Sequence, residues 1–142
     1  MTSAGLTATD SAFADFMIRC HEALAQQTQG HSAPFLELWS HTEDATVMAA
    51  VGGYHVGFEN VSKLLSDVSK TLDFDTWGVE TIATHVDGDF AYTVEVERMT
   101  RRVEGKIEEM AVRATQVYRR SDNGWRVLHR HGDLLSPVAV KW

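Results

Sequence analysis

The sequence is poor in cysteine and proline, and it has no long apolar run. Cys20 is the single cysteine, so no disulfide can form within the chain and secretion is not indicated. No apolar stretch approaches the roughly 20 residues that a membrane-spanning helix needs. Residues 1–10 lack the basic stretch and following apolar segment of a secretory signal. We therefore expect a cytoplasmic protein.

A surplus of basic residues is also missing. Lys and Arg number 13 against 20 Asp and Glu, and the formal net charge is −7 at pH 7. Nucleic-acid binding depends on clustered Lys and Arg that neutralise phosphates. The basic residues here are mostly interleaved with acids, as in Arg101-Arg102 and Glu108-Glu109. We expect neither nucleic acid nor a membrane as a partner.

The length and composition of the chain are those of one globular domain. A chain of 142 residues suggests a single domain, and its 44% hydrophobic content is ordinary for a globular protein. A domain of this length buries about two-thirds of the surface that the unfolded chain exposes, so one core is enough. We expect one domain over residues 1–142, with flexible tails at 1–8 and 136–142.

Apolar residues recur at helical spacing in the N-terminal half. The spacing predicts helices over residues 13–24, 33–39 and 61–72. Residues 44–51 predict a strand, and a second, short strand runs through Val56 after a Gly-Gly turn. Two helices, two strands and a third helix therefore precede the rest of the chain.

The C-terminal half is rich in β-branched and aromatic residues. Four strands are predicted at 77–86, 90–103, 107–120 and 125–133, with turn signals between them. The predicted order is α-α-β-β-α-β-β-β-β, in which the last four strands form an antiparallel meander. Helices gathered on one face of such a sheet make an α+β fold.

Two tight turns predict the register of the meander. Glu104-Gly105-Lys106 and Asp122-Asn123-Gly124 each suit a three-residue loop that contains a left-handed glycine. The second loop places Ser121 opposite Trp125, and farther along the strands Tyr118, Gln116 and Ala114 oppose Leu128, Arg130 and Gly132. The first loop places opposite charges across the strands: Arg102 with Glu108, Arg101 with Glu109, and Glu97 with Arg113.

Strand alternation then divides the side chains between two faces. The more apolar face should meet the helices, and its few polar groups should line a pocket. It holds Tyr92, Val94, Val96, Arg98, Val112, Ala114, Gln116, Tyr118, Leu128 and Arg130. The other face should meet solvent or a partner subunit. It holds Thr93, Glu95, Glu97, Arg113, Thr115, Val117, Trp125, Val127, His129, His131 and Asp133.

Two segments carry a family resemblance. Residues 43–47 with Gly52, and residues 115–120 with Trp125 and His129-Arg130-His131, resemble the first strand and the last hairpin of the nuclear transport factor 2-like superfamily. The SnoaL-like and ketosteroid-isomerase-like branch is the most similar, and the resemblance covers nearly the whole chain. It implies a cystatin-like fold, in which a cone-shaped, curved antiparallel sheet wraps around N-terminal helices. This fold hosts isomerases, cyclases, dehydratases and assembly domains, so the resemblance alone does not imply one activity.

The catalytic residues that the resemblance would imply for ketosteroid isomerase are missing. Its carboxylate base matches Ala49, its tyrosine matches Ala23, and residues 110–120 contain no acid for its late strand. The carboxylate site of the calcium/calmodulin-dependent kinase association domain is also missing. The positions that match its arginines and histidine are Val94, Gln116, Gly132 and Val61.

We expect the pocket to bind a small apolar or mildly acidic organic molecule without a cofactor. A tyrosine can donate a hydrogen bond to a carbonyl oxygen, and an arginine can bind an anion through two hydrogen bonds. A cofactor-independent isomerase, cyclase or dehydratase is one interpretation, and a non-catalytic assembly or ligand-sensing module is the alternative. The sequence leaves catalysis open, since we place no acid or base in the pocket. The candidate pocket residues are Trp39, His55, Tyr92, Arg98, Gln116, Tyr118 and Arg130.

A metal site is a further possibility to test on the second face. His129, His131 and Asp133 alternate on one strand and could approach a metal if Glu95 or Glu97 supplied another ligand. The alternative is a polar sheet face, and we expect no metal.

The second face also predicts a homodimer. A soluble domain rarely leaves an apolar and aromatic strip bare, and a two-fold interface uses the same patch on both subunits. The expected dimer face consists of Arg113, Thr115, Val117, Trp125, Val127, His129 and His131.

Overall fold

The computed structural model describes residues 7–135 and has the predicted order of elements. The expected tails lie outside this range except for residues 7 and 8, and Ala8 already begins the first helix. None of the helices in the described range is long and apolar enough to cross a membrane. The elements are α1 (Ala8–Gln27), α2 (Ala33–Glu37), β1 (Thr46–Met48), β2 (His55–Val56), α3 (Phe58–Ser69), β3 (Thr76–Asp87), β4 (Phe90–Val103), β5 (Lys106–Ser121) and β6 (Gly124–Leu134).

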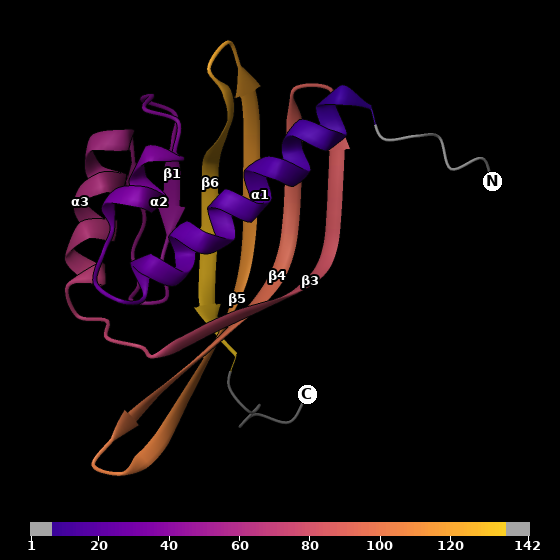
Figure 1. Cartoon of the computed structure of the whole chain (residues 1–142). Helices are drawn as coiled ribbons and strands as arrows, with labels where there is room; N and C mark the ends of the chain where they lie inside the picture. Colours follow the sequence, from indigo (N-terminus) through magenta and orange to yellow (C-terminus); the bar gives the residue numbers. More distant parts are fainter. Residues whose placement is uncertain (1–6, 136–142) are drawn as a thin grey trace, which may run out of the picture.

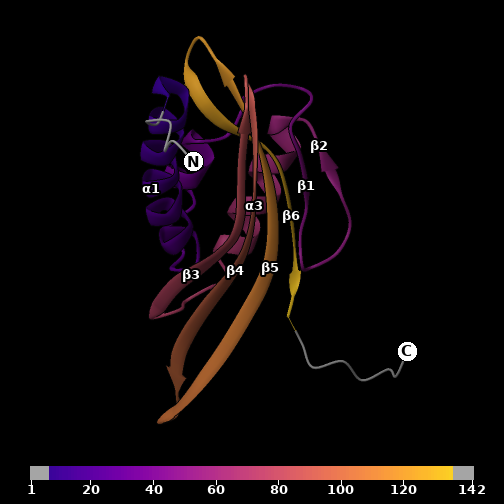
Figure 2. The same cartoon turned by 90° about the vertical axis from the view of Figure 1, so that its right-hand side faces the viewer.

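The strands form one six-stranded sheet in the order β2-β1-β6-β5-β4-β3. Strands β3 to β6 make the expected antiparallel meander, whereas β1 pairs with β6 in parallel, with Thr46 opposite His129. Helix α1 lies across β6 to β3, with α2 and α3 toward the β1 end (Figure 1). Seen from the side, α1 covers one face of the curved sheet and the opposite face carries no helix (Figure 2). The predicted α+β architecture, with helices on one face of a curved sheet, is thus confirmed.

Helix α1 is positioned by its N-terminal cap and by a stripe of buried apolar residues, which includes Phe13, Phe16 and Leu24. The side chain of Thr7 accepts a hydrogen bond from the backbone N–H of Asp10 at 3.0 Å, which satisfies a free donor at the helix start. The buried stripe packs on the sheet, where the Phe13 ring meets Tyr118 and Trp125 edge-on at centroid distances of 5.0 and 5.1 Å. Such pairs add about 0.5–1.5 kcal/mol beyond the area they bury.

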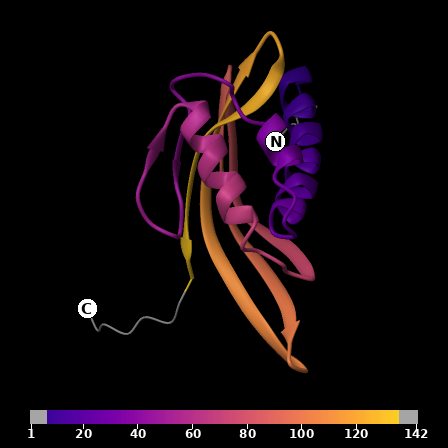
Figure 3. The ribbon, with the colours of Figure 1, turned by 90° about the vertical axis from the view of Figure 1, so that its left-hand side faces the viewer.

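Helix α3 completes the helical layer beside β1 and β2 (Figure 3). Its buried residues include Val61 and Leu65. Gly57, with φ of 87°, precedes the helix and donates its N–H to the carbonyl of Ala45 at 2.7 Å. That left-handed conformation favours glycine, so the residue fixes the direction in which α3 leaves the sheet.

The turn between β4 and β5 contains two residues instead of the expected three. Val103 pairs with Lys106, and both Glu104 (φ 52°) and Gly105 (φ 80°) are left-handed. Two positive φ angles define a type I′ turn, whose twist matches that of the strands. The predicted pairs Arg102–Glu108, Arg101–Glu109 and Glu97–Arg113 are therefore wrong by one residue: Arg101 instead pairs with Glu108, at 2.9 Å.

This one-residue shift reverses the expected faces of β4. Side chains alternate along a strand, so a shift of one residue exchanges the faces. Thr93, Glu95 and Glu97 lie buried on the helix-covered face, whereas Tyr92 and Arg98 are exposed on the opposite face. We call these the inner and outer faces of the sheet.

The hairpin of β5 and β6 contains a bulge that moves two aromatic and apolar side chains inward. Ser121 pairs with Gly124 and Tyr118 with Val127, and the register shifts before Val117 meets His129. Trp125 and Val127 are consequently buried in the core rather than on the outer face. Beyond the bulge the predicted register is confirmed, with Gln116 opposite Arg130 and Ala114 opposite Gly132.

Candidate functional site

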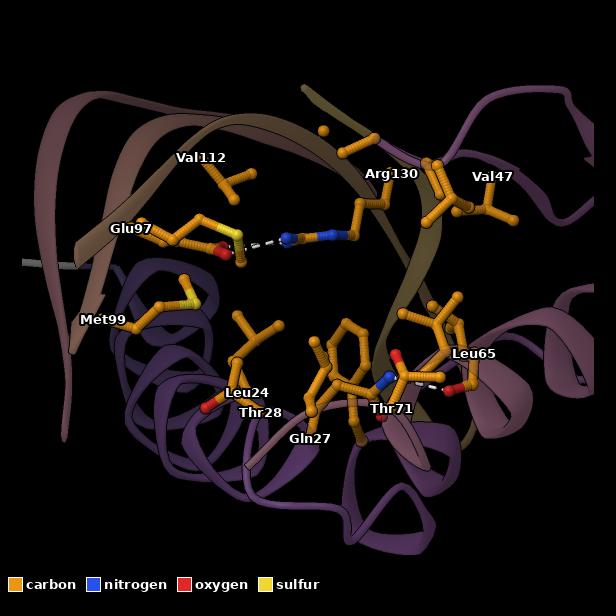
Figure 4. A pocket seen from close by; sticks show the side chains of 18 of the residues that line it. Leu24, Gln27, Thr28, Val47, Leu65, Thr71, Glu97, Met99, Val112 and Arg130 are labelled. Carbon is orange, nitrogen blue, oxygen red and sulfur yellow. Dashed lines mark hydrogen bonds and ion pairs between the residues drawn. The ribbon is translucent and has the colours of Figure 1, made fainter. Parts of the chain in front are cut away.

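A cavity of about 250 Å³ lies between the helices and the inner face of the sheet. Apolar side chains from α1, α2, α3, β1, β4 and β5 make most of its wall. They include Leu24, Phe35, Val47, Leu65, Met99 and Val112. Figure 4 shows Arg130 reaching toward Glu97 on one side of the open space, with Leu24, Gln27 and Leu65 on the other.

Arg130 and Glu97 form a buried ion pair at this cavity. Nη1 of Arg130 donates to Oε2 of Glu97 at 2.9 Å, and Nη2 donates to Oε1 at 2.7 Å. Their side chains are 13% and 2% exposed. Burial works to lower the pKa of Arg130, but the attraction and hydrogen bonds of Glu97 outweigh it and raise that pKa. The guanidinium is therefore charged and held in place.

A chain of hydrogen bonds extends the ion pair into the core. Arg130 Nη1 also donates to Oε1 of Gln116 at 2.8 Å, and Gln116 Nε2 donates to the Tyr118 hydroxyl at 2.7 Å. The Tyr118 hydroxyl lies 2.7 Å from Oγ1 of Thr93. Burial raises the pKa of Tyr118 well above its usual value. The phenol is thus neutral, and its hydroxyl is occupied within the protein.

Cys20 lies beside this network and does not belong to an exposed site. Gln116 Nε2 approaches its Sγ at 3.8 Å. Burial raises the pKa of the Cys20 thiol to about 12. Because the thiolate is the reactive form, Cys20 is a buried, inert thiol in this geometry.

Three polar side chains line the helical side of the cavity. Gln27 Nε2 donates to the carbonyl of Leu65 at 2.8 Å, and the hydroxyl groups of Thr28 and Thr71 donate to carbonyls of their own helical turns. Oε1 of Gln27 is buried and has no partner among the described residues. The amide oxygen of Gln27 is therefore a buried acceptor without a hydrogen bond in the described range.

The seven predicted pocket residues separate into four groups. Arg130 lines the cavity, and Gln116 and Tyr118 lie directly behind it. Trp39 is fully buried behind Phe35, with the two rings edge-on at 5.9 Å. His55 lies on the edge strand β2, outside the cavity wall. Tyr92 and Arg98 were predicted on the wrong face, because the β4–β5 turn is one residue shorter than expected.

The outer face keeps most of its predicted members. Arg113, Thr115, Val117, His129 and His131 lie on it or at its edge, but Trp125 and Val127 do not, because the bulge turns them into the core. Burial and the neighbouring charge of His131 lower the pKa of His129, whose Nδ1 lies 2.8 Å from Oγ1 of Thr46.

The candidate metal ligands do not converge on one point: Asp133 is hydrogen-bonded to another side chain, and the two glutamates lie on the opposite face of the sheet from the histidines. Asp133 accepts two hydrogen bonds from Arg113, and Glu95 and Glu97 lie on the inner face. Over residues 7–135 there is no group of three or more His, Cys, Asp or Glu side chains that could hold a metal ion.

Sequence reasoning missed two buried acids, Glu95 and Glu97. Oε2 of Glu95 lies 2.8 Å from Nε2 of His21 and accepts a hydrogen bond from Thr81 at 2.7 Å. Buried carboxylates need such partners. Arg130 on β6 and His21 on α1 were the signal that could have identified them, but the predicted register placed both acids on the outer face.

The comparisons with known proteins agree with this architecture. Residues 20–137 match the model of a family described as SnoaL-like domain. No curated protein matches the chain. A nuclear transport factor 2-like superfamily protein from Salmonella enterica serovar Typhimurium is similar in structure, with TM-score 0.70 and 18% identity, and the match covers 94% of this chain and 97% of that one.

Two further solved structures are similar over almost their whole length. A ketosteroid isomerase-like protein from Erwinia carotovora atroseptica has TM-score 0.70 and 14% identity, covering 93% of this chain and 100% of that one. A protein of the same superfamily with a cystatin-like fold, from Novosphingobium aromaticivorans, has TM-score 0.66 and 20% identity, covering 94% and 93%. At these identities the similarity establishes the fold alone.

Proposed function

Because the chain belongs to the SnoaL-like domain family, we propose that it binds a small organic molecule in the cavity between α1, α3 and the sheet. The observation that carries this proposal is an apolar cavity with one ion pair in its wall. Apolar linings with a few placed polar groups are typical of small-molecule sites. An apolar cavity of 150 Å³ binds benzene, so 250 Å³ has room for about ten non-hydrogen atoms.

Binding without reaction is favoured because the one carboxylate in the cavity wall is already hydrogen-bonded. Glu97 is the one acid among the residues that line the cavity, and Arg130 donates to both of its oxygens. A general base must reach the proton that it abstracts, and this carboxylate is already occupied. A cofactor-independent isomerase, cyclase or dehydratase would require Arg130 to release Glu97 when substrate binds. Ligand binding or sensing therefore comes first in our proposal, and catalysis second.

The proposal is tested with a variant that fills the cavity. Val112 is buried and lines the cavity, whereas Val103 lies at the exposed β4–β5 hairpin. We expect some members of a panel of small organic compounds to raise the melting temperature of the wild type and of Val103→Phe, but not that of Val112→Phe. If no compound stabilises the wild type, or if Val112→Phe responds equally, the cavity is not the binding site.

We also propose a homodimer through the outer face. This face carries no helix (Figure 2), and on it the exposed Tyr92 (42%) lies opposite the half-buried Val117. Light scattering should report a dimer at neutral pH, and weaker association at acidic pH, where His129 gains charge. Val117→Asp should give a monomer, and Val103→Asp should not. A monomeric wild type would refute the dimer.

The expected cellular location and the expected absence of nucleic-acid partners stay predictions. The expectation of a cytoplasmic location rests on the single cysteine. The expectation that nucleic acids are not partners rests on the excess of acidic over basic residues.

A further inference from the structure

Two of the N–H groups of the Arg130 guanidinium make no hydrogen bond within the described residues. An arginine carries five N–H donors. In Arg130, Nη1 donates to Glu97 and to Gln116, and Nη2 donates once, to Glu97. The Nε–H and the second Nη2–H have no hydrogen-bond partner in the part of the chain that the structure describes.

These two free donors share one edge of the guanidinium plane. The equivalent edge of Arg113 shows what it can do, because its Nε and Nη2 both donate to the carboxylate of Asp133, at 2.7 and 2.9 Å. Next to the free edge of Arg130 stands Gly132, which also lines the cavity. A Cβ at Gly132 would lie 3.3 Å from Cγ1 of Val112 and 3.6 Å from Nη2 of Arg130, so any side chain at this position would crowd the edge.

The charge of the cavity wall decides what can occupy that edge. Glu97 and Arg130 are the ionisable residues in the wall, and they neutralise each other at 2.7–2.9 Å. A carboxylate on the free edge would bring a second negative charge into an apolar space next to Glu97, with no cation left to balance it. A neutral carbonyl oxygen can accept the same hydrogen bonds without adding charge.

We propose that the cavity selects uncharged carbonyl compounds, such as amides, lactones or ketones, over carboxylates of the same shape. The carbonyl oxygen accepts hydrogen bonds from the free edge of Arg130, and Glu97 sets the preference by neutralising that arginine. This inference rests on the proposed binding function of the cavity. It changes the sequence-based expectation of a mildly acidic ligand, which arose because Glu97 was placed on the outer face.

Benzamide and benzoate test the proposal, because they have nearly the same shape and differ in charge. Calorimetric titration of the wild type should show benzamide binding at least about tenfold more tightly, the scale of a charged hydrogen bond. Glu97→Gln frees the positive charge of Arg130, so benzoate affinity should rise about tenfold or more. Glu95→Gln is the matched control: it neutralises the neighbouring buried acid, which binds His21 instead, and should keep the wild-type preference.

Each result has a distinct meaning. A wild type that prefers benzoate overturns the inference and leaves cavity binding intact, provided that Val112→Phe abolishes the binding. A folded Glu97→Gln variant without a gain for benzoate also overturns it. If Glu97→Gln does not fold, the wild-type comparison decides alone. Failure of both compounds to bind the wild type overturns the proposed function and the inference together.

Discussion

Glu97 and Arg130 meet across a strand that separates them. They lie on β4 and β6, with β5 between, and their contacts measure 2.7 and 2.9 Å. Gln116 on the intervening β5 accepts a further hydrogen bond from Arg130 at 2.8 Å. One side chain from each of three strands thus joins a buried polar cluster, and the cluster borders the cavity.

Substitutions of the two partners in the ion pair should have non-additive effects on the free energy of unfolding. Removing one partner of a buried pair leaves the other charge uncompensated, which typically costs about 3–5 kcal/mol. Urea denaturation should show a loss of this size for Arg130→Met and for Glu97→Gln, and a loss well below their sum for the double variant. The exposed pair Arg113–Asp133 is the control, and Arg113→Met should cost less than about 1 kcal/mol. Additive losses for Glu97 and Arg130 would contradict the coupling.

Two tyrosine-to-phenylalanine substitutions test the assignment of faces. Tyr118 is fully buried, and its hydroxyl contacts Gln116 and Thr93, so Tyr118→Phe leaves buried groups without a partner. We expect a loss of about 1–3 kcal/mol in the free energy of unfolding. Tyr92 is 42% exposed on the outer face, and Tyr92→Phe should change this free energy by less than about 0.5 kcal/mol. Equal effects would contradict the register described here.

Acid should destabilise the protein through His129. Burial and the charge of His131 lower its pKa from the ordinary value of 6.5. Below pH 6.5 the unfolded chain therefore binds more protons than the folded protein, and stability falls as the pH drops through the folded pKa. Urea denaturation between about pH 8 and pH 5 should show this decline. The decline should be shallower in His129→Gln, and an equally steep decline in that variant would assign the effect to other groups.

The order of elements followed from periodicity, whereas the register of β4 did not. Helical stripes such as the one through Phe13 and Leu24, and the β-branched runs, depend on local spacing that the sequence displays directly. The β4–β5 register depends on one residue of loop length. Gly105 suits a two-residue or a three-residue loop, and only the left-handed Glu104 distinguishes them. Glutamate rarely adopts that conformation, so local preference favoured the longer loop.

The site was predicted only in part, because the register of β4 was wrong. Arg130, Gln116 and Tyr118 were predicted together and lie in one hydrogen-bonded chain. Glu97 was missed because the alternate positions of β4, such as Val94 and Val96, look more apolar than those that hold the acids. The interior accepts Glu97 because Arg130 pairs with it, and that pairing depends on three strands at once.

A methyl NMR titration of the wild type with benzamide tests the binding cavity most directly. We expect shift changes at methyl groups that line the cavity, on Leu24, Leu65 and Val112, and none at Val94 and Val117 on the outer face. Val112→Phe should abolish the changes at Leu24 and Leu65. Changes confined to the outer face, or none at saturating benzamide, would contradict a binding cavity beneath the Glu97–Arg130 pair.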